Sequence, residues 1–129
     1  MLVVDASVAV RVAAGSSSWT LTSDELIAPS LLWSEVSSAI HAAWWRREID
    51  ADRAQVLRTR FAALTIRRVQ PRRLLDVAWD LADQLGLAKT YDAEFLALAR
   101  LEGCRVVTAD RRLLALGRRL DLTVAPGEL

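Results

Sequence analysis

Four carboxylate side chains interrupt otherwise apolar segments of this 129-residue chain. They are Asp5 in LVVDASV, Glu35 in LLWSEVSSAI, Asp92 in TYDAEFLALA and Asp110 in VVTADRRLL. A carboxylate that leaves water costs free energy unless its charge is compensated. Four such residues in one small domain therefore indicate a site for a divalent cation. The chain has a single histidine, a single cysteine and no Cys/His cluster of the zinc type, so oxygen ligands are expected, and these favour Mg²⁺ or Mn²⁺.

Mg²⁺ held by carboxylates suits the hydrolysis of phosphodiester bonds. The ion binds a substrate phosphate, polarises the phosphoryl group and lowers the pKa of a bound water. A second ion, roughly 4 Å away, would stabilise the leaving oxygen. Ser7 and Thr108 lie close in sequence to Asp5 and Asp110, and their hydroxyls could orient a metal-bound water or a phosphate oxygen. No residue has to act as a covalent nucleophile.

Each acid also has a purely structural interpretation. Asp5, Asp92 and Asp110 could cap the helices that follow them, because Asp is a favoured N-cap residue. Glu35 could be a surface acid of an amphipathic helix, although its neighbours Leu32 and Ala39 favour the inner face. The metal-site hypothesis depends on the set of four acids more than on any one of them.

Predicted strands alternate with predicted helices along the chain. β-type runs cover residues 2–4, 65–69, 105–108 and 122–125, and helices are predicted over 7–14, 20–26, 29–47, 50–64, 71–85, 90–101 and after Asp110. This alternation predicts an α/β fold, with a parallel sheet and helices on both faces. No linker, repeat or low-complexity tract interrupts it, so residues 1–129 are expected to form a single domain.

These elements could bring the acids together at one edge of the sheet. In open parallel sheets, ligands bind beyond the carboxyl ends of the strands. Asp5 and Asp110 each follow a predicted strand and would reach the same edge. Asp92 lies in a first helical turn, where free N–H groups and the helix dipole favour an ionised carboxylate. Glu35 lies in the second turn of its helix and its longer side chain can reach inward.

The tryptophans and other large apolar residues give predictions about burial. Trp33 and Trp79 are expected in the core. Trp44 and Trp45 diverge by about 100° on a helix, so one of them should be exposed and contact a partner chain. The inner face of the 71–85 helix is predicted to consist of Leu74, Leu75, Ala78, Trp79, Ala82 and Leu85.

Charge and hydropathy bear on two questions, namely whether the protein binds nucleic acid and whether it contacts a membrane. The net charge is +1, but setting the four acids aside leaves 17 basic residues against 12 acidic ones (16 − 4), and sixteen of the bases are arginine. Arginine suits phosphate groups, yet an arginine-rich composition with solvated helix faces explains these residues equally well. No stretch approaches the ~20 apolar residues of a membrane span, and no signal-peptide pattern opens the chain, so a cytoplasmic protein without membrane contact is expected.

Taken together, these motifs resemble a PIN-domain ribonuclease of the VapC toxin type. The matching segments LVVDASVAV, IAPSLLWSEVSSAI, GLAKTYDAEFLALA and VVTADRRLL occur in the order of that family. The resemblance implies a small parallel sheet flanked by helices, and endonucleolytic RNA cleavage that leaves a 5′-phosphate and a 3′-hydroxyl. It also implies Mg²⁺ or Mn²⁺ bound by Asp5, Glu35, Asp92 and Asp110. The implied partners are an RNA substrate, a VapB-type antitoxin, a second copy of the chain, and operator DNA through the antitoxin complex.

Other classes fit the residues less well. A haloacid-dehalogenase-like enzyme needs a second Asp two residues after Asp5, where this chain has Ser7. A receiver domain needs a lysine after a late strand, and VVTADRR has none. A P-loop NTPase needs a GK[ST] motif, which the chain lacks. A housekeeping nuclease without an antitoxin and a catalytically silent binding module both stay open.

Overall fold

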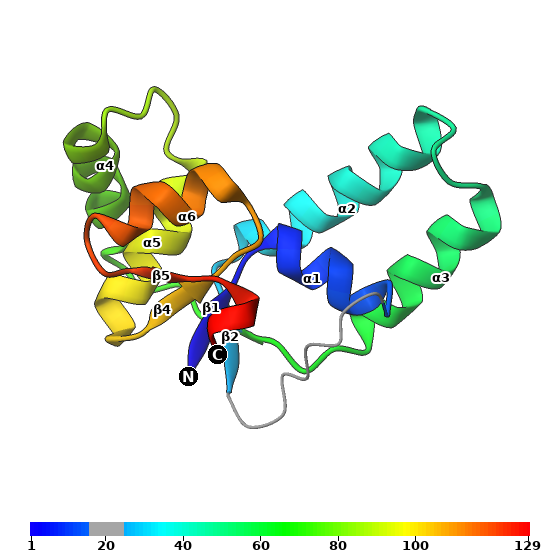
Figure 1. Cartoon of the computed structure of the whole chain (residues 1–129), viewed down its shortest axis with the longest axis horizontal. Coiled ribbons are helices and arrows are strands. Elements are labelled where there is room, and N and C mark those ends of the chain that lie inside the picture. The colour runs from blue at the N-terminus through cyan, green and yellow to red at the C-terminus, as the bar shows by residue number, and fades with distance from the viewer. Residues whose placement is uncertain (16–24) are drawn as a thin grey trace.

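The computed structural model describes residues 1–15 and 25–129 as a parallel sheet with helices around it (Figure 1). The strands pair in parallel in the order β3-β2-β1-β4-β5. The elements are β1 (Leu2–Val4), α1 (Ala6–Ala13), β2 (Leu26–Ala28), α2 (Leu31–Trp45), α3 (Ala51–Ala62), β3 (Arg67–Arg68), α4 (Leu74–Leu85), α5 (Tyr91–Glu102), β4 (Arg105–Val107), α6 (Arg111–Arg118), β5 (Thr123–Val124) and the short 3-10 helix η1 (Pro126–Glu128).

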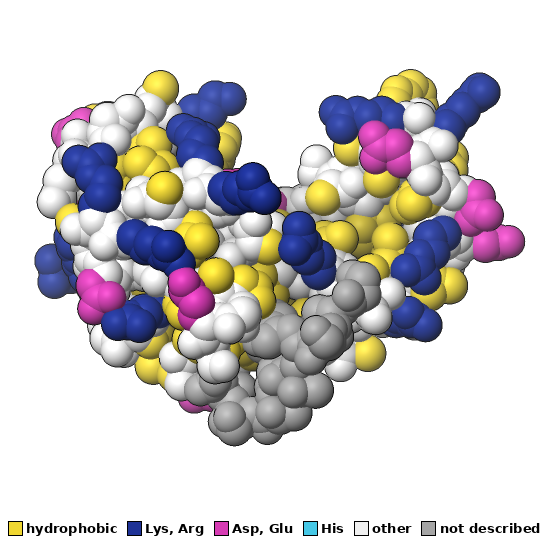
Figure 2. Space-filling model, viewed as in Figure 1, with side chains coloured by type: hydrophobic (Ala, Val, Ile, Leu, Met, Phe, Trp, Pro, Cys, Tyr) yellow, Lys and Arg dark blue, Asp and Glu magenta, His cyan; other side chains and the backbone are white. Residues whose placement is uncertain are grey.

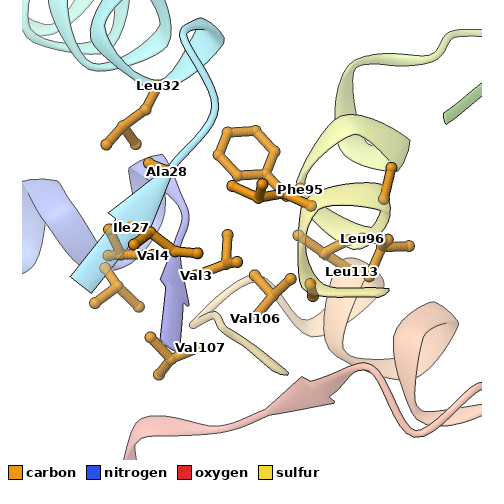
Figure 3. Close-up of a cluster of buried hydrophobic side chains, with 14 of the residues drawn as sticks. Val3, Val4, Ile27, Ala28, Leu32, Phe95, Leu96, Val106, Val107 and Leu113 are labelled. Carbon is orange, nitrogen blue, oxygen red and sulfur yellow. The ribbon is translucent and has the colours of Figure 1, made fainter. Parts of the chain in front are cut away.

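Both faces of the sheet are covered. Consecutive strand residues point to opposite faces, and Val3 and Val4 of β1 are both fully buried, as are Val106 and Val107 of β4. Figure 3 shows Phe95 of α5 extending toward the end of β2 and the start of α2. The predicted α/β fold, with a parallel sheet between helices, is therefore confirmed.

Local sequence signals explain where several helices begin and end. The carboxylates of Asp5, Asp50 and Asp110 accept hydrogen bonds from backbone N–H groups at the starts of α1, α3 and α6. Gly86 and Gly103 end α4 and α5 in the left-handed conformation, with φ of 71° and 66°, which glycine adopts without a steric penalty.

The predicted helix over 20–26 is wrong at its described end. Leu26 belongs to β2, which pairs with β1 so that Leu2 faces Leu26 and Val3 faces Ile27. Residues 20–24 lie outside the described part of the chain. All three residues of β2 are buried, and a fully buried strand has no alternation of polar and apolar residues. A three-residue apolar run is too short for periodicity to separate strand from helix.

The predicted inner face of α4 is partly wrong. Leu75 and Trp79 are 61% and 65% exposed, whereas Leu74 and Ala78, one position earlier in each case, are fully buried. α4 packs mainly on α5, and a single helical neighbour covers only a narrow stripe. That stripe consists of Leu74, Ala78, Leu81, Ala82 and Leu85.

Trp33, Trp44 and Trp45 belong to α2, which forms an arm of the molecule together with α3 (Figure 1). Trp33 is half-buried, with Phe61 against its ring and Arg68 over its face at 4.2 Å from the ring centroid. Trp44 and Trp45 are 41% and 74% exposed. Both therefore face solvent, whereas their spacing on the helix had required the exposure of only one. Within residues 1–15 and 25–129, no helix has the length and hydrophobicity to cross a membrane.

Candidate active site

Asp5 is the most firmly held of the predicted acids. It follows β1, beside the carboxyl end of β4, and only 5% of its surface is exposed. Its Oδ1 accepts hydrogen bonds from the Ser7 hydroxyl at 2.7 Å and from the Val8 N–H at 3.1 Å, and its Oδ2 accepts one from the Thr108 hydroxyl. Burial raises the pKa of Asp5, while these three hydrogen bonds lower it and the nearby charge of Asp110 raises it.

Ser7 and Thr108 connect Asp5 to the segment that leads to Asp110. The Ser7 hydroxyl accepts a hydrogen bond from the Ala109 N–H, and the Thr108 hydroxyl accepts one from the Asp110 N–H, both at 3.0 Å. A hydroxyl has one proton to donate, and both protons go to Asp5. In this conformation the two hydroxyls therefore position Asp5, whereas the sequence had suggested that they orient a water or a phosphate.

Asp110 is both the N-cap of α6 and a neighbour of Asp5. Its Oδ1 accepts hydrogen bonds from the N–H groups of Arg112 at 2.8 Å and Leu113 at 3.2 Å. Among the described residues none donates to its Oδ2, so one carboxylate oxygen is available to a ligand. The capping interpretation of Asp110 is thus confirmed, and it leaves a site role possible.

Asp92 lies in the first turn of α5, two residues after the N-cap position of Thr90. The Thr90 side chain makes no capping hydrogen bond, and Asp92 is not the cap. Its half-buried carboxylate has its Oδ2 3.7 Å from Nη1 of Arg112. Burial and the charge of Asp110 raise the pKa of Asp92, and the charge of Arg112 lowers it.

Glu35 is half-buried near the start of α2, and among the four acids its pKa is shifted most strongly. Burial raises its pKa to about 7, with further contributions from the charges of Asp92, Asp5 and Glu94. Such a pKa is the result of burial first and of nearby negative charges second. Glu35 was expected to lie on the inner face of its helix, and its partial burial agrees with that expectation.

Glu94 is an acid that the sequence-based reasoning missed. It is only 9% exposed, no hydrogen bond or ion pair of its side chain is found in the described structure, and burial raises its pKa. Its charge contributes to the raised pKa of Glu35. The available signal was an acid directly before the continuously buried run of Phe95 to Ala99.

The structure brings the four predicted acids into one electrostatic neighbourhood. Asp110 raises the pKa of both Asp5 and Asp92, and Asp5 and Asp92 raise that of Glu35. In the described residues, however, no three carboxylate, histidine or cysteine side chains stand close enough together to hold one ion. The donor set fits a hard divalent cation, because it consists of carboxylate oxygens whose negative charges raise the pKa values of neighbouring acids.

The end of β1, directly before Asp5, lies between two parts of the molecule (Figure 1). α2 and α3 form an arm on one side, and α4, α5 and α6 lie on the other side, with the end of β1 between them (Figure 1). Figure 2 shows a broad notch between these two parts, with basic side chains, drawn in dark blue, on both of them. A cavity of about 320 Å³ between α2 and α3 is lined by residues other than the four acids, among them Ile40, His41 and Trp44.

Comparisons with known proteins agree with this architecture. The family model described as PIN domain matches residues 2–119. The chain is 33% identical, over 134 aligned positions, to VapC ribonuclease Mb0985 of Mycobacterium bovis and to ribonuclease VapC9 of Mycobacterium tuberculosis. Each alignment covers 98% of this chain and 99% of the relative.

Two solved structures have a similar fold. The crystal structure of PAE2754 from Pyrobaculum aerophilum aligns with a TM-score of 0.73 and 25% identity, over 98% of this chain and 89% of that one. A chain of a toxin–antitoxin complex from Klebsiella pneumoniae aligns with a TM-score of 0.67 and 19% identity over the full length of both chains. The second likeness concerns the fold alone.

Proposed function

Because this chain belongs to the PIN-domain family, we propose that it is an endoribonuclease toxin of the VapC type that depends on Mg²⁺ or Mn²⁺. The observation that carries the proposal is the position of Asp5. Ser7 and Thr108 hold it at the edge of the sheet, within the electrostatic reach of Asp110 and Glu35. Residues 1–129 act as a single domain in this proposal.

Asp5, Glu35, Asp92 and Asp110 are the residues that would hold the metal. The bound ion supplies Lewis-acid activation of a phosphodiester and of a water. Ser7 and Thr108 fix the orientation of the Asp5 carboxylate, and the N–H groups of α6 fix that of Asp110. Glu35 must lose a proton to act as a ligand, and its pKa of about 7 makes this step sensitive to pH near neutrality.

The partners of this chain follow from its relation to VapC ribonucleases. A VapB-type antitoxin would neutralise the toxin, two toxin chains would form a homodimer, and operator DNA would be bound only through the antitoxin complex. The exposed Trp44 and Trp45 offer an apolar surface for one of the protein contacts. The proposed location is the cytoplasm, where RNA and antitoxin are both accessible.

Cleavage of total RNA tests the metal site. We expect RNA cleavage on addition of Mg²⁺ or Mn²⁺, and a loss of at least about 100-fold in Asp5→Asn and Asp92→Asn, because each change removes a charged ligand for the ion. Asp76→Asn is the matched control, since Asp76 is an exposed acid of α4 remote in sequence from the acid motifs. The measurement is the initial rate of RNA cleavage, with folding checked by circular dichroism.

Two outcomes would contradict the proposal. Equal activity of the wild type and the two site variants would remove the assigned site. Absence of cleavage with either metal would favour a binding module without catalysis. Expression with and without the neighbouring gene separates a toxin from a housekeeping nuclease, because only a toxin is relieved by an antitoxin.

A further inference from the structure

Arg112 contacts two acids of the candidate site from the first turn of α6. Its backbone N–H donates to Oδ1 of Asp110 at 2.8 Å, and its Nη1 lies 3.7 Å from Oδ2 of Asp92. The side chain is 71% exposed. The guanidinium group therefore lies at the solvent side of the acids, where a substrate would approach.

The contact with Asp92 leaves most of the N–H groups of the guanidinium free to bind another group. A separation of 3.7 Å is too long for a hydrogen bond, and an ion pair with this exposure contributes little to stability. In the described part of the chain, the Arg112 side chain donates no hydrogen bond. Its planar array of N–H donors, which matches two oxygens of a phosphate, is thus available.

Several other arginines are held elsewhere. Arg67 pairs with Glu25 at 2.7 Å, Arg105 pairs with Asp121 at 2.8 Å, and Arg118 pairs with Glu128. Each of these pairs includes a hydrogen bond or a close contact with an acid that lies outside the candidate site. Arg112 differs because its ion-pair partner is itself a proposed metal ligand.

Binding of RNA beside these acids requires a positively charged side chain such as that of Arg112. RNA is a polyanion, and it would have to approach several carboxylates whose charges already raise one another's pKa values. We propose that Arg112 binds a backbone phosphate of the RNA beside the acids and so positions the strand for cleavage; this inference rests on the proposed function. When Asp92 takes part in holding a cation, its charge is compensated, and its attraction for Arg112 weakens in favour of the phosphate.

Steady-state kinetics on a short single-stranded RNA tests this role. Arg112→Ala should raise KM on the order of 10-fold, because a charge-assisted hydrogen bond to phosphate is lost, and should change kcat less. Arg112→Lys should recover part of the affinity, since lysine keeps the charge without the two-point contact. Arg111→Ala is the matched control, as Arg111 is the adjacent exposed arginine of the same turn and its side chain forms no ion pair with an acid in the described part of the chain.

Direct RNA binding separates this inference from the proposed ribonuclease activity. Fluorescence anisotropy would measure the affinity of a labelled RNA for each variant, in the Asp5→Asn background with Mg²⁺ and in the otherwise native chain with EDTA. We expect Arg112→Ala to bind RNA more weakly than Arg111→Ala, and to show a shallower dependence of affinity on salt. This arm gives a result even if no RNA is cleaved.

Three results would overturn the inference. The first is an equal KM and an equal RNA affinity in the Arg112→Ala and Arg111→Ala variants. The second is a loss of Mg²⁺ affinity in Arg112→Ala, measured by titration calorimetry, with unchanged RNA affinity; Arg112 would then only tune Asp92. The third is a fall in melting temperature that accounts for the whole effect on activity.

Discussion

At the scale of single residues, the acids of the site differ in how their charge is supported. Asp5 receives three hydrogen bonds that favour its charged form. No hydrogen bond to the Glu35 side chain is found within the described residues, and burial with the charges of Asp92, Asp5 and Glu94 raises its pKa to about 7. Asp5 is therefore held in place before any ligand arrives, whereas the charged form of Glu35 is disfavoured, chiefly by burial and further by the neighbouring acids.

The raised pKa of Glu35 leads to an expected dependence of stability on pH. Between its usual pKa of 4.5 and about 7, the folded metal-free protein keeps a proton that the unfolded chain has released. The folded state then binds more protons, so stability falls as the pH rises through this interval. Solvent screening at this half-buried side chain limits the loss to about 1–2 kcal/mol.

Denaturant unfolding in EDTA at several pH values measures this effect. The free energy of unfolding of Glu35→Gln should fall less than that of the wild type between pH 4.5 and 7. Added Mg²⁺ should stabilise the wild type more strongly above pH 7 than below it, because protons compete with the ion for Glu35. Parallel pH profiles of the wild type and Glu35→Gln, with Asp76→Asn as a surface control, would contradict the assignment.

At the scale of elements, α6 connects the site to the far edge of the sheet. Its first turn carries Asp110 and Arg112, and its last turn packs on β5 through Gly117. A β-carbon at Gly117 would lie 2.1 Å from Cγ2 of Thr123, whose hydroxyl donates to the Leu114 carbonyl at 2.8 Å. This close approach sets the distance between α6 and β5, and through α6 it affects the position of Asp110.

Gly117→Ala should therefore destabilise the fold and reduce activity together. Forcing a methyl group into this contact should cost about 1–3 kcal/mol, because α6 has to move away from Thr123. Gly127→Ala is the matched control, since a β-carbon there meets nothing within 4 Å. Thermal unfolding and the RNA cleavage rate are the two measurements. A variant as stable and as active as Gly127→Ala would show that α6 tolerates the shift.

At the scale of the whole molecule, the two parts seen in Figure 1 expose different aromatic surfaces. On the arm, the rings of Trp44 and Trp45 lie 6.4 Å apart, and His41 packs against both of them. On the other part, Trp79 and Leu75 are exposed together on α4. Exposed aromatic clusters of this kind are typical of surfaces that contact another protein.

Association should weaken when the aromatic surface of the arm is removed. We expect Trp44→Ala or Trp45→Ala to reduce dimer formation or antitoxin binding on the order of 10-fold, as buried aromatic anchors dominate interface energies. Trp79→Ala removes a similar exposed ring from the other part of the molecule and shows whether the effect is local. Sedimentation velocity and titration with the antitoxin are the measurements. Unchanged association in both arm variants would exclude a role for this surface.

The sequence alone was sufficient for the features that depend on local chemistry. The apolar strands β1 and β4, the caps at Asp5 and Asp110 and the glycine ends of helices follow from neighbouring residues, because backbone conformation and capping act over a few positions. The resemblance to PIN-domain ribonucleases followed from short motifs of the same kind. The proximity of Asp5 and Asp110 could be predicted from strand ends, since parallel strands share one edge.

Only the tertiary structure decided the features that depend on distant contacts. Thr108 donates to Asp5 across 103 positions, β2 exists because it pairs with β1, and Arg112 reaches Asp92 from another helix. Trp79 is exposed because α4 has few neighbours besides α5, which its own periodicity could not reveal. Burial and long-range hydrogen bonds are properties of the packed chain, so spacing along the sequence leaves them open.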